Sequence, residues 1–526
     1  MESKNSSLTA VFSACAMALA VTMVQPANAQ ATFPDAAPRA AGEGDGPYAR
    51  LLIEGGTIID GTGAPPRGPV NIVVEGNRIV SVGESPPDGI THRIDAKGLF
   101  IVPGMVDTHV RVMNGGRDMT PDYALKLLLA HGVTTITSMQ PMQYLDWALK
   151  LSQQSARNEI VAPRVQPWAD YRGQPTAAET KAELQKLYAR GVRGLGEGAI
   201  WSSPEVIKAS LIEAKRLGFR VSWHMNPLHL YKFNALEAAR AGLNGLAHWY
   251  NLPETMFEGQ ALQHYPEDYN YADVRSRFRQ SGRLWKQAAP SGSELRERVL
   301  NEFRALDFTF EPTFSVYEAN RDYMGTRNAE WNKEYLHPVL AREFQPSATG
   351  SFAHFYDWSS TDEIEWRENF RLWMQFLNEY KNRGGRVVLG TDSGFMWTTF
   401  GFGFVRNMEL LQEAGFTPLE VLSSATRQGA EHLNMAGQVG TIEVGKLADL
   451  VIVNGDPMKN LKVFYGTGIE TLASDGRVVL GGGVKYTIKD GIVFDAPKLL
   501  ADVREMVRKA KEKDQAAATV SNNTQH

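Results

Sequence analysis

The sequence predicts an α/β fold in which a parallel (β/α)8 TIM barrel carries a small composite β-sandwich domain. Two observations predict it. Strand-like apolar segments alternate with amphipathic helical segments between residues 105 and 436, and short β-branched runs rich in glycine, asparagine and aspartate lie on both flanks. The chain has 526 residues, 43% of them hydrophobic, and it can therefore bury a core of this size.

Eight segments of the central region have the length and composition of buried strands. The helical segments between them, such as PDYALKLLLAHG and PEVIKASLIEAKRLG, have apolar residues at helical spacing and end near glycine. This alternation predicts parallel strands joined by helical crossovers. The eight predicted strands are MVDTHVRV, GVTTITSM, APRVQPWA, VRGLGEG, FRVSWHM, GLNGLAHW, FTFEPTF and RVVLGTDS.

The two flanks are expected to form one β domain. RLLIEGGTIIDGTG and HRIDAKGLFIVPG on the amino-terminal side, and GTIEVGKLADLVIVNG and YTIKDGIVFD on the carboxyl-terminal side, are typical of short strands and hairpins. We therefore assign residues 49–104 and 437–495 to the composite β domain and 105–436 to the barrel. Residues 496–526 are expected to form a helix followed by a disordered tail after Lys511.

The first 29 residues have the pattern of a secretory signal peptide. Lys4 precedes an apolar run over residues 8–24, and the small residues of ANAQ follow it. A Pro/Ala/Gly-rich linker is expected over residues 30–48. The only cysteine, Cys15, lies inside the apolar run, so the mature chain would contain neither a disulfide nor a cysteine nucleophile. We expect a periplasmic or secreted protein without a membrane span in its mature form, the alternative being an uncleaved anchor.

The charge balance and the missing motifs exclude several classes of function. A net charge of -4 does not favour a nucleic-acid partner, and the basic run at residues 275–286 is typical of a solvated helix face. The chain contains neither a Gly-x-Ser-x-Gly elbow nor a dinucleotide-binding loop. A small-molecule substrate is the remaining expectation, and a homo-oligomer stays open.

Four metal-binding side chains are expected at the carboxyl ends of barrel strands. His109 ends the first predicted strand, His224 the fifth, His248 the sixth and Asp392 the eighth. TIM barrels carry their chemistry at this rim, and histidine and aspartate are common zinc ligands. The sequence therefore predicts a metal site there.

Four motifs resemble the amidohydrolase superfamily in order and position: LLIEGGTIIDGTG, IDAKGLFIVPGMVDTH, GTDSG and GTIEVGKLADLVIVNGDP. The resemblance covers residues 50–495 and is nearest to the secreted imidazolonepropionase and Xaa-Pro dipeptidase branch. It implies a hydrolase that cleaves a carbon–nitrogen bond with metal-activated water. In this family one metal is bound by the His-x-His pair of strand 1 and the aspartate of strand 8. A second is bound by a lysine or glutamate of strand 4 and the histidines of strands 5 and 6.

The first strand departs from this pattern, because VDTHVRV has Arg111 in place of the second histidine. Side chains two residues apart on a strand share a face, so Arg111 is expected to point into the barrel mouth with His109. A guanidinium has no lone pair to give a metal. Its charge would replace that of the missing ion and pair with Asp392 or Glu197. We therefore expect the first metal site to be absent.

Strand 4 offers no lysine, and Glu197 is its only candidate carboxylate. The pattern is similar to N-acetylglucosamine-6-phosphate deacetylases, which bind one metal through a strand-4 glutamate and the histidines of strands 5 and 6. This similarity implies one Zn2+ or another divalent ion on Glu197, His224 and His248. The alternative role for Glu197 is that of ion-pair partner to Arg111.

Three functions follow from these residues. In a metal-dependent hydrolase of an amide, peptide or cyclic amide, Asp392 would act as general base, and Arg111 or the metal would stabilise the oxyanion. In a metal-free lyase or isomerase, Arg111 would stabilise an anion. In a binding protein without catalysis, Asp392 would only anchor Arg111. Aromatic residues of the 315–375 region could line an apolar pocket or pack loops on the barrel: Tyr317, Tyr323, Trp331, Phe352, Phe355, Tyr356, Trp358 and Trp366.

Overall fold

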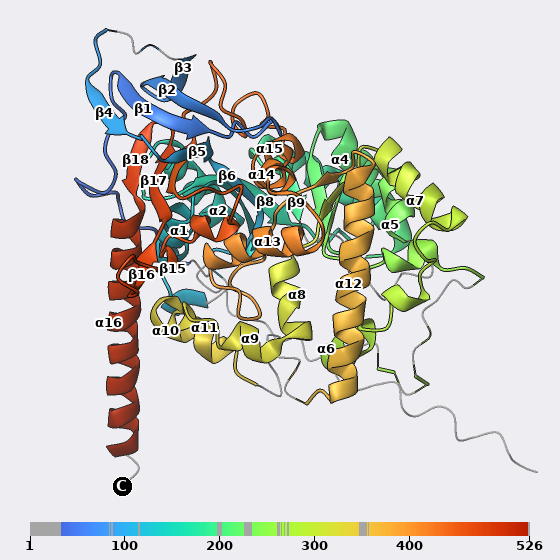
Figure 1. Cartoon of the computed structure of the whole chain (residues 1–526). Coiled ribbons are helices and arrows are strands. Elements are labelled where there is room, and N and C mark those ends of the chain that lie inside the picture. Colours follow the sequence, from blue (N-terminus) through green and yellow to red (C-terminus); the bar gives the residue numbers. More distant parts are fainter. Residues whose placement is uncertain are drawn as a thin grey trace, which may run out of the picture. The chain divides into compact units, whose positions relative to one another are not determined.

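Eight parallel strands follow one another in chain order in a single sheet of the computed structural model (Figure 1). The structure describes residues 33–523 except 84, 86–87, 114–115, 197–201, 226–233, 260–263, 265, 268, 271–272, 347–354 and 356. All eight strands were predicted from the sequence. They are β6 (Met105–Val110), β7 (Val133–Pro141), β8 (Arg164–Asp170), β9 (Gly194–Gly196), β10 (Arg220–Trp223), β11 (Gly245–Ala247), β12 (Thr309–Glu311) and β13 (Arg386–Val387).

Backbone hydrogen bonds between the first and last strands close this sheet into a barrel. The chain continues beyond β13, and there the Thr108 N–H donates to the carbonyl oxygen of Leu389 at 2.9 Å. The Asp392 N–H donates to the carbonyl oxygen of His109 at 2.8 Å, and Val110 pairs in parallel with Ser393. The predicted (β/α)8 barrel is confirmed.

Helices connect the strands, and their ends follow local sequence signals. In α4 the Ser203 side chain accepts a hydrogen bond from the Val206 N–H, Pro204 occupies the first turn, and Gly218 ends the helix with a φ of 83°. The crossover helices are α1 (Pro121–Ala130), α2 (Leu145–Ala156), α3 (Ala177–Ala189), α4 (Pro204–Leu217), α5 (Ala235–Ala241), α7 (Glu294–Ala305), α12 (Ser360–Asn382), α13 (Phe402–Glu413), α14 (Pro418–Ala425) and α15 (Arg427–His432).

Strands from both ends of the chain share a second sheet, as predicted for the composite β domain. Its order is β18-β17-β14-β5-β1-β2-β3, with β4 paired to β1, and the antiparallel pair β5–β14 joins the two ends. The domain boundaries remain predictions. The strands are β1 (Leu51–Ile58), β2 (Arg67–Glu75), β3 (Arg78–Gly83), β4 (His92–Asp95), β5 (Phe100–Pro103), β14 (Leu450–Asn454), β17 (Gly483–Lys489) and β18 (Ile492–Asp495); β15 (Ile469–Leu472) and β16 (Val478–Gly481) form a separate hairpin.

Short helices fill the two long insertions that follow β11 and β12. The aromatic 315–375 region is largely helical instead of being a set of loops, and α8 packs against α12 and α13. Among the described residues, no helix has the length and apolar character needed to cross a membrane. The insertion helices are η4 (Pro253–Met256), α6 (Val274–Ser281), η5 (Trp285–Gln287), α8 (Phe314–Arg321), α9 (Tyr323–Arg327), α10 (Asn332–Tyr335) and α11 (Pro338–Glu343).

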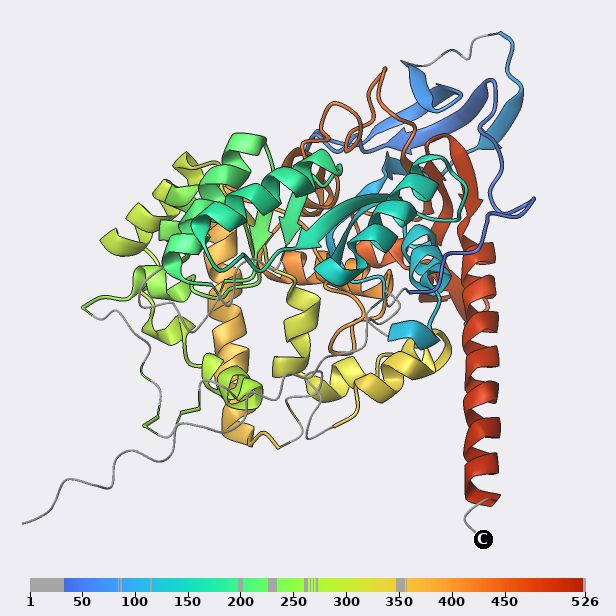
Figure 2. The same cartoon turned by 180° about the vertical axis from the view of Figure 1, so that it is seen from behind.

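The two terminal segments are more ordered than expected. Within the expected linker, Pro38 pairs with Ile160 and Asp45 with Val493. The expected disorder after Lys511 is not found, because α16 (Ala496–Asn523) runs through it as one helix that packs on α1, α10 and α11 (Figures 1 and 2). Residues 512–523 contain neither proline nor glycine, and the three successive alanines at 516–518 favour helix.

Arg164 ties the barrel to the composite sheet. It lies at the start of β8, is 9% exposed, and forms ion pairs with Asp449 and Asp490 beside β14 and β17. It also donates a hydrogen bond to the hydroxyl of Thr135 on β7 at 3.1 Å. Removal of one partner from a buried ion pair leaves the other charge uncompensated.

We therefore expect Arg164→Leu to lower the free energy of unfolding by about 3–5 kcal/mol, because buried Asp449 loses its ion pair with Arg164 and Asp490 keeps only that with Lys489. Urea denaturation measures this change. Arg240→Leu is the control, since it removes an exposed ion pair with Glu302 and should cost less than about 1 kcal/mol. Equal losses in the two variants would contradict the assigned role of Arg164.

Candidate functional site

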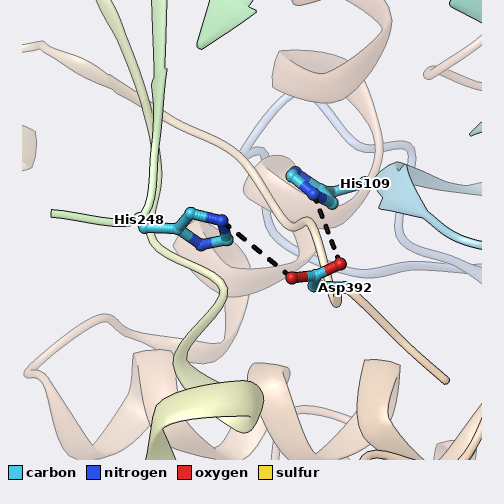
Figure 3. Close-up of side chains that lie close together, drawn as sticks. All are labelled: His109, His248 and Asp392. Atoms are coloured by element: carbon cyan, nitrogen blue, oxygen red, sulfur yellow. Dashed lines mark ion pairs between the residues drawn. The ribbon is translucent and has the colours of Figure 1, made fainter. Parts of the chain in front are cut away.

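Three predicted ligands meet at the carboxyl ends of the barrel strands. His109 lies on β6, His248 directly follows β11, and Asp392 lies in the extension of β13. One ligand atom from each lies within 4.8 Å of the other two, and all three side chains are buried (Figure 3). The barrel thus brings three of the candidate side chains close together.

Strained backbone holds two of these side chains. His248 has a φ of 66° and Asp392 a φ of 52°, values that side chains other than glycine rarely adopt. The Nδ1 atom of His248 hydrogen-bonds the hydroxyl of Thr313 at 2.6 Å, which leaves its Nε2 facing Asp392 Oδ2 at 3.9 Å. Strain of this kind is concentrated at functional sites, where the surrounding structure enforces it.

His109 lies between two carboxylates. Its Nε2 is 3.4 Å from Asp392 Oδ1, and its Nδ1 is 3.5 Å from Glu311 Oε1. Glu311 is fully buried at the end of β12 and accepts hydrogen bonds from the hydroxyls of Thr108 at 2.8 Å and Ser222 at 2.6 Å. Burial lowers the pKa of His109, but the charges of Asp392 and Glu311 more than offset it and raise the pKa to about 10.

The first glycine of GTDSG makes room for this contact. A Cβ atom on Gly390 would lie 2.2 Å from Glu311 Oε1 and 2.7 Å from the Cβ of His109. Real Cβ atoms essentially never approach so closely, so only glycine lets Glu311 and His109 occupy their observed positions. This motif therefore serves the site through both Gly390 and Asp392.

Arg111 pairs with Asp392, one of its two expected partners. Its Nε donates to Asp392 Oδ1 at 2.6 Å, as the alternation along β6 predicts. Burial raises the pKa of Asp392, but the charges of Arg111, His109 and His248 outweigh burial and hold that pKa well below its usual range. Asp392 is thus an ionised carboxylate shared between a guanidinium and two imidazoles.

His224 lies beside this cluster and is not part of it. Its ring centre is 5.1 Å from that of His248, and it stacks on Tyr250 at 4.2 Å. Burial lowers the pKa of His224 well below its usual value, and the charges of Arg277 and Arg111 lower it further. The neutral imidazole, which is the form that binds a metal, is thereby favoured at His224.

The metal set inferred from the sequence can be compared only in part. Glu197 lies outside the described residues, so the predicted Glu197, His224 and His248 group is not testable in this structure. Among the described residues, the structure brings together His109, His248 and Asp392. Sequence reasoning missed Glu311, although it is the only acidic residue of the predicted strand FTFEPTF.

The aromatic residues proposed to line a pocket have mixed surroundings. Tyr317 and Trp366 are buried near the cluster, and the Tyr317 ring centre lies 5.5 Å from that of His248. Trp331 instead stacks on Phe402 and Tyr465, so it packs the insertion against the barrel. Phe352 and Tyr356 lie outside the described residues.

Sequence and structure comparisons point to one superfamily. A profile described as Amidohydrolase family matches residues 373–493. The chain is 36% identical over 91 residues to a D-aminoacylase of Alcaligenes xylosoxydans xylosoxydans, which is 17% of this chain and 17% of the relative. It is 35% identical over 102 residues to an imidazolonepropionase of Geobacillus sp. (strain WCH70), 19% of this chain and 24% of the relative.

Solved structures extend the likeness to most of the fold. A Xaa-Pro dipeptidase with bound methionine in its active site gives a TM-score of 0.56 at 17% identity, covering 85% of this chain and all of that one. The matched segments are thus similar to the amidohydrolase superfamily, and the solved structures share its fold. An ochratoxinase of A. niger gives a TM-score of 0.54 at 16% identity, covering 85% of this chain and 96% of that one. The sequence matches nevertheless span less than a quarter of the length of the two curated relatives named above.

The donor atoms fit the divalent metal that the superfamily implies. Two imidazoles and a carboxylate from three strands form a nitrogen and oxygen set of the kind that zinc binds in catalytic sites. Both ring nitrogens of His109 are buried without a hydrogen-bond partner among the described residues. A metal ligand role would satisfy one of them, and Glu311 would orient the ring through the other. The set fits one ion, with Arg111 competing for Asp392 Oδ1.

Arg111→His is expected to raise the affinity of the site for zinc, because it restores the His-x-His pair and frees Asp392 Oδ1. Zinc per chain, measured by elemental analysis after dialysis against a defined zinc concentration, is the readout. Arg111→Gln is the matched control, since it frees Asp392 without adding a ligand. A folded Arg111→His variant with unchanged zinc content would rule out this account of residue 111.

Proposed function

We propose that this protein is a metal-dependent hydrolase that cleaves a carbon–nitrogen bond of an amide, peptide or cyclic amide. The observation that carries the proposal is the buried group of His109, His248 and Asp392 at the catalytic rim of the barrel. Similarity to the amidohydrolase superfamily supports the type of bond that is cleaved. The similar chains named as a D-aminoacylase and a Xaa-Pro dipeptidase support an amide or peptide substrate.

One divalent ion per chain, zinc by preference, belongs to this proposal. His109, His248 and Asp392 would hold it, with His224 and Glu197 as further candidate ligands. When bound, such an ion lowers the pKa of a water molecule towards 7 and polarises a carbonyl oxygen. Thr313 orients the His248 ring through a hydrogen bond, and Glu311, 3.5 Å from His109 Nδ1, would orient the other imidazole, as outer partners of metal ligands do.

Asp392 is the proposed general base. It is ionised, because Arg111 and the histidines hold its pKa low, and it can accept a proton from the attacking water. The same carboxyl group then returns the proton to the leaving nitrogen, which completes hydrolysis. Arg111 holds Asp392 in place and lies where its guanidinium can stabilise negative charge that develops on the carbonyl oxygen.

The ion pair between Arg111 and Asp392 also favours a second candidate function. The Arg111 Nε atom lies 2.6 Å from Asp392 Oδ1. Arg111 thereby places a fixed positive charge at the position where the family resemblance implies a second metal-binding histidine. A metal-free lyase or isomerase could use that charge to stabilise an enolate-like anion, with Asp392 moving the proton. The Arg111–Asp392 ion pair would also be compatible with a binding protein that has no catalytic activity.

The proposed site of action is the periplasm or the exterior of the cell. The amino-terminal segment over residues 1–29 supports it, with a lysine, an apolar run and small residues in the order of a signal peptide. Residues 1–32 lie outside the described residues, so the support is from sequence alone.

Asp392→Asn is expected to lower kcat for amide hydrolysis by about 10²- to 10⁴-fold, because the asparagine cannot accept the proton of the attacking water. Steady-state kinetics on the best substrate from a panel of N-acyl amino acids and dipeptides gives this number. Asp307→Asn is the control, since Asp307 precedes β12 at the opposite end of the barrel and pairs with Arg386. Full activity of Asp392→Asn would exclude the proposed base.

A further inference from the structure

Helix α6 carries three arginines, and only the outer two have ion-pair partners among the described residues. Arg275 lies 3.6 Å from Asp273, and Arg279 lies 3.1 Å from Asp357. Arg277, between them, forms no ion pair with any described residue. Its Nε atom is buried and has no hydrogen-bond acceptor in the part of the chain that the structure describes.

Arg277 lies beside the aromatic wall of the candidate site. Its guanidinium carbon is 5.6 Å from the ring centre of Tyr250. The Tyr250 ring stacks on His224, and its hydroxyl accepts a hydrogen bond from the hydroxyl of Tyr317 at 3.1 Å. The Tyr317 ring in turn contacts that of His248. Arg277 is therefore a neighbour of the metal-binding histidines, although it comes from an insertion outside the barrel.

Among the described residues, no counter-ion lies beside Arg277. Arg111 pairs with Asp392, whereas the contacts of Arg277 in the described part of the chain are with the faces of Tyr250 and Phe278, which stabilise a cation weakly. A partly buried guanidinium without a counter-ion costs free energy, and a negatively charged ligand removes that cost. A planar guanidinium matches a carboxylate in particular, since it can donate two parallel hydrogen bonds to it.

We propose that Arg277 binds a carboxylate of the substrate, so that the enzyme acts on amides of amino acids or peptides with a free carboxyl group. This substrate class deepens the hydrolase function proposed above and rests on it. One uncompensated cation matches one negative charge, and this favours a carboxylate over a phosphate dianion. The carboxylate would lie against Tyr250 and direct the neighbouring amide towards His248 and Asp392.

The test compares matched ligands on the full-length protein. N-benzoyl derivatives of glycine, alanine, phenylalanine and proline are titrated by calorimetry, each as the free acid and as the uncharged carboxamide. At least one free acid is expected to bind roughly 10- to 100-fold more tightly than its carboxamide. Arg277→Gln should remove that preference and Arg277→Lys should retain part of it.

Arg279→Gln is the matched control on the same helix, and it should leave the preference intact. The assignment fails if no pair shows a preference for the free acid, or if a folded Arg277→Gln variant keeps one. Hydrolysis is followed in the same samples. Hydrolysis without a preference for the free acid would overturn the role of Arg277 alone. A preference for the free acid without hydrolysis would overturn the hydrolase function, and Arg277 would still be assigned as an anion-binding residue.

Discussion

The closure of the barrel between its first and last strands is the constraint on which the site depends. The backbone hydrogen bond from Asp392 to His109 and the side-chain bond from Thr391 Oγ1 to Asp107 at 2.7 Å fix β6 against the extension of β13. Residues 281 positions apart in the chain are thereby placed side by side. Without this closure Asp392 would contact neither Arg111 nor His109, and no shared carboxylate would exist.

Arg111 makes this site differ from the two-histidine arrangement that the family resemblance implies. Because the Arg111 guanidinium already pairs with Asp392 Oδ1, a metal ion would compete with it for that oxygen or bind Asp392 Oδ2. The charges of Asp392 and Glu311 raise the pKa of His109 to about 10, and Arg111 pairs with the same Asp392. A metal held by His109 would have to displace a proton from a protonated imidazole, so its affinity would rise with pH.

Much of the fold and part of the site could be predicted from the sequence. The eight strands were visible as apolar runs between amphipathic helices, and the alternation along VDTHVRV placed Arg111 and His109 on one face. His248 and Asp392 followed from their places at strand ends. The pairing of Arg111 with Asp392 could not be derived, because it depends on which strands become neighbours in three dimensions.

Glu311 and Arg277 show why the rest could not be predicted. Glu311 acts through hydroxyls on two other strands, Thr108 and Ser222, and a single sequence does not reveal such contacts. Arg277 lies in a run of basic residues that reads as a solvated helix face, and only the absence of an ion-pair partner among described residues distinguishes it from its neighbours. Helix α16 was misjudged because its polar composition suits both a solvated tail and an exposed helix.

Elemental analysis of the purified protein, prepared without chelators and again after zinc loading, tests the central claim most directly. About one equivalent of divalent metal per chain, lost together with amide hydrolysis on chelation and restored with it, is the predicted result. A chain that stays free of metal after zinc loading would contradict the account, and it would mean that Arg111 has taken the place of the cation.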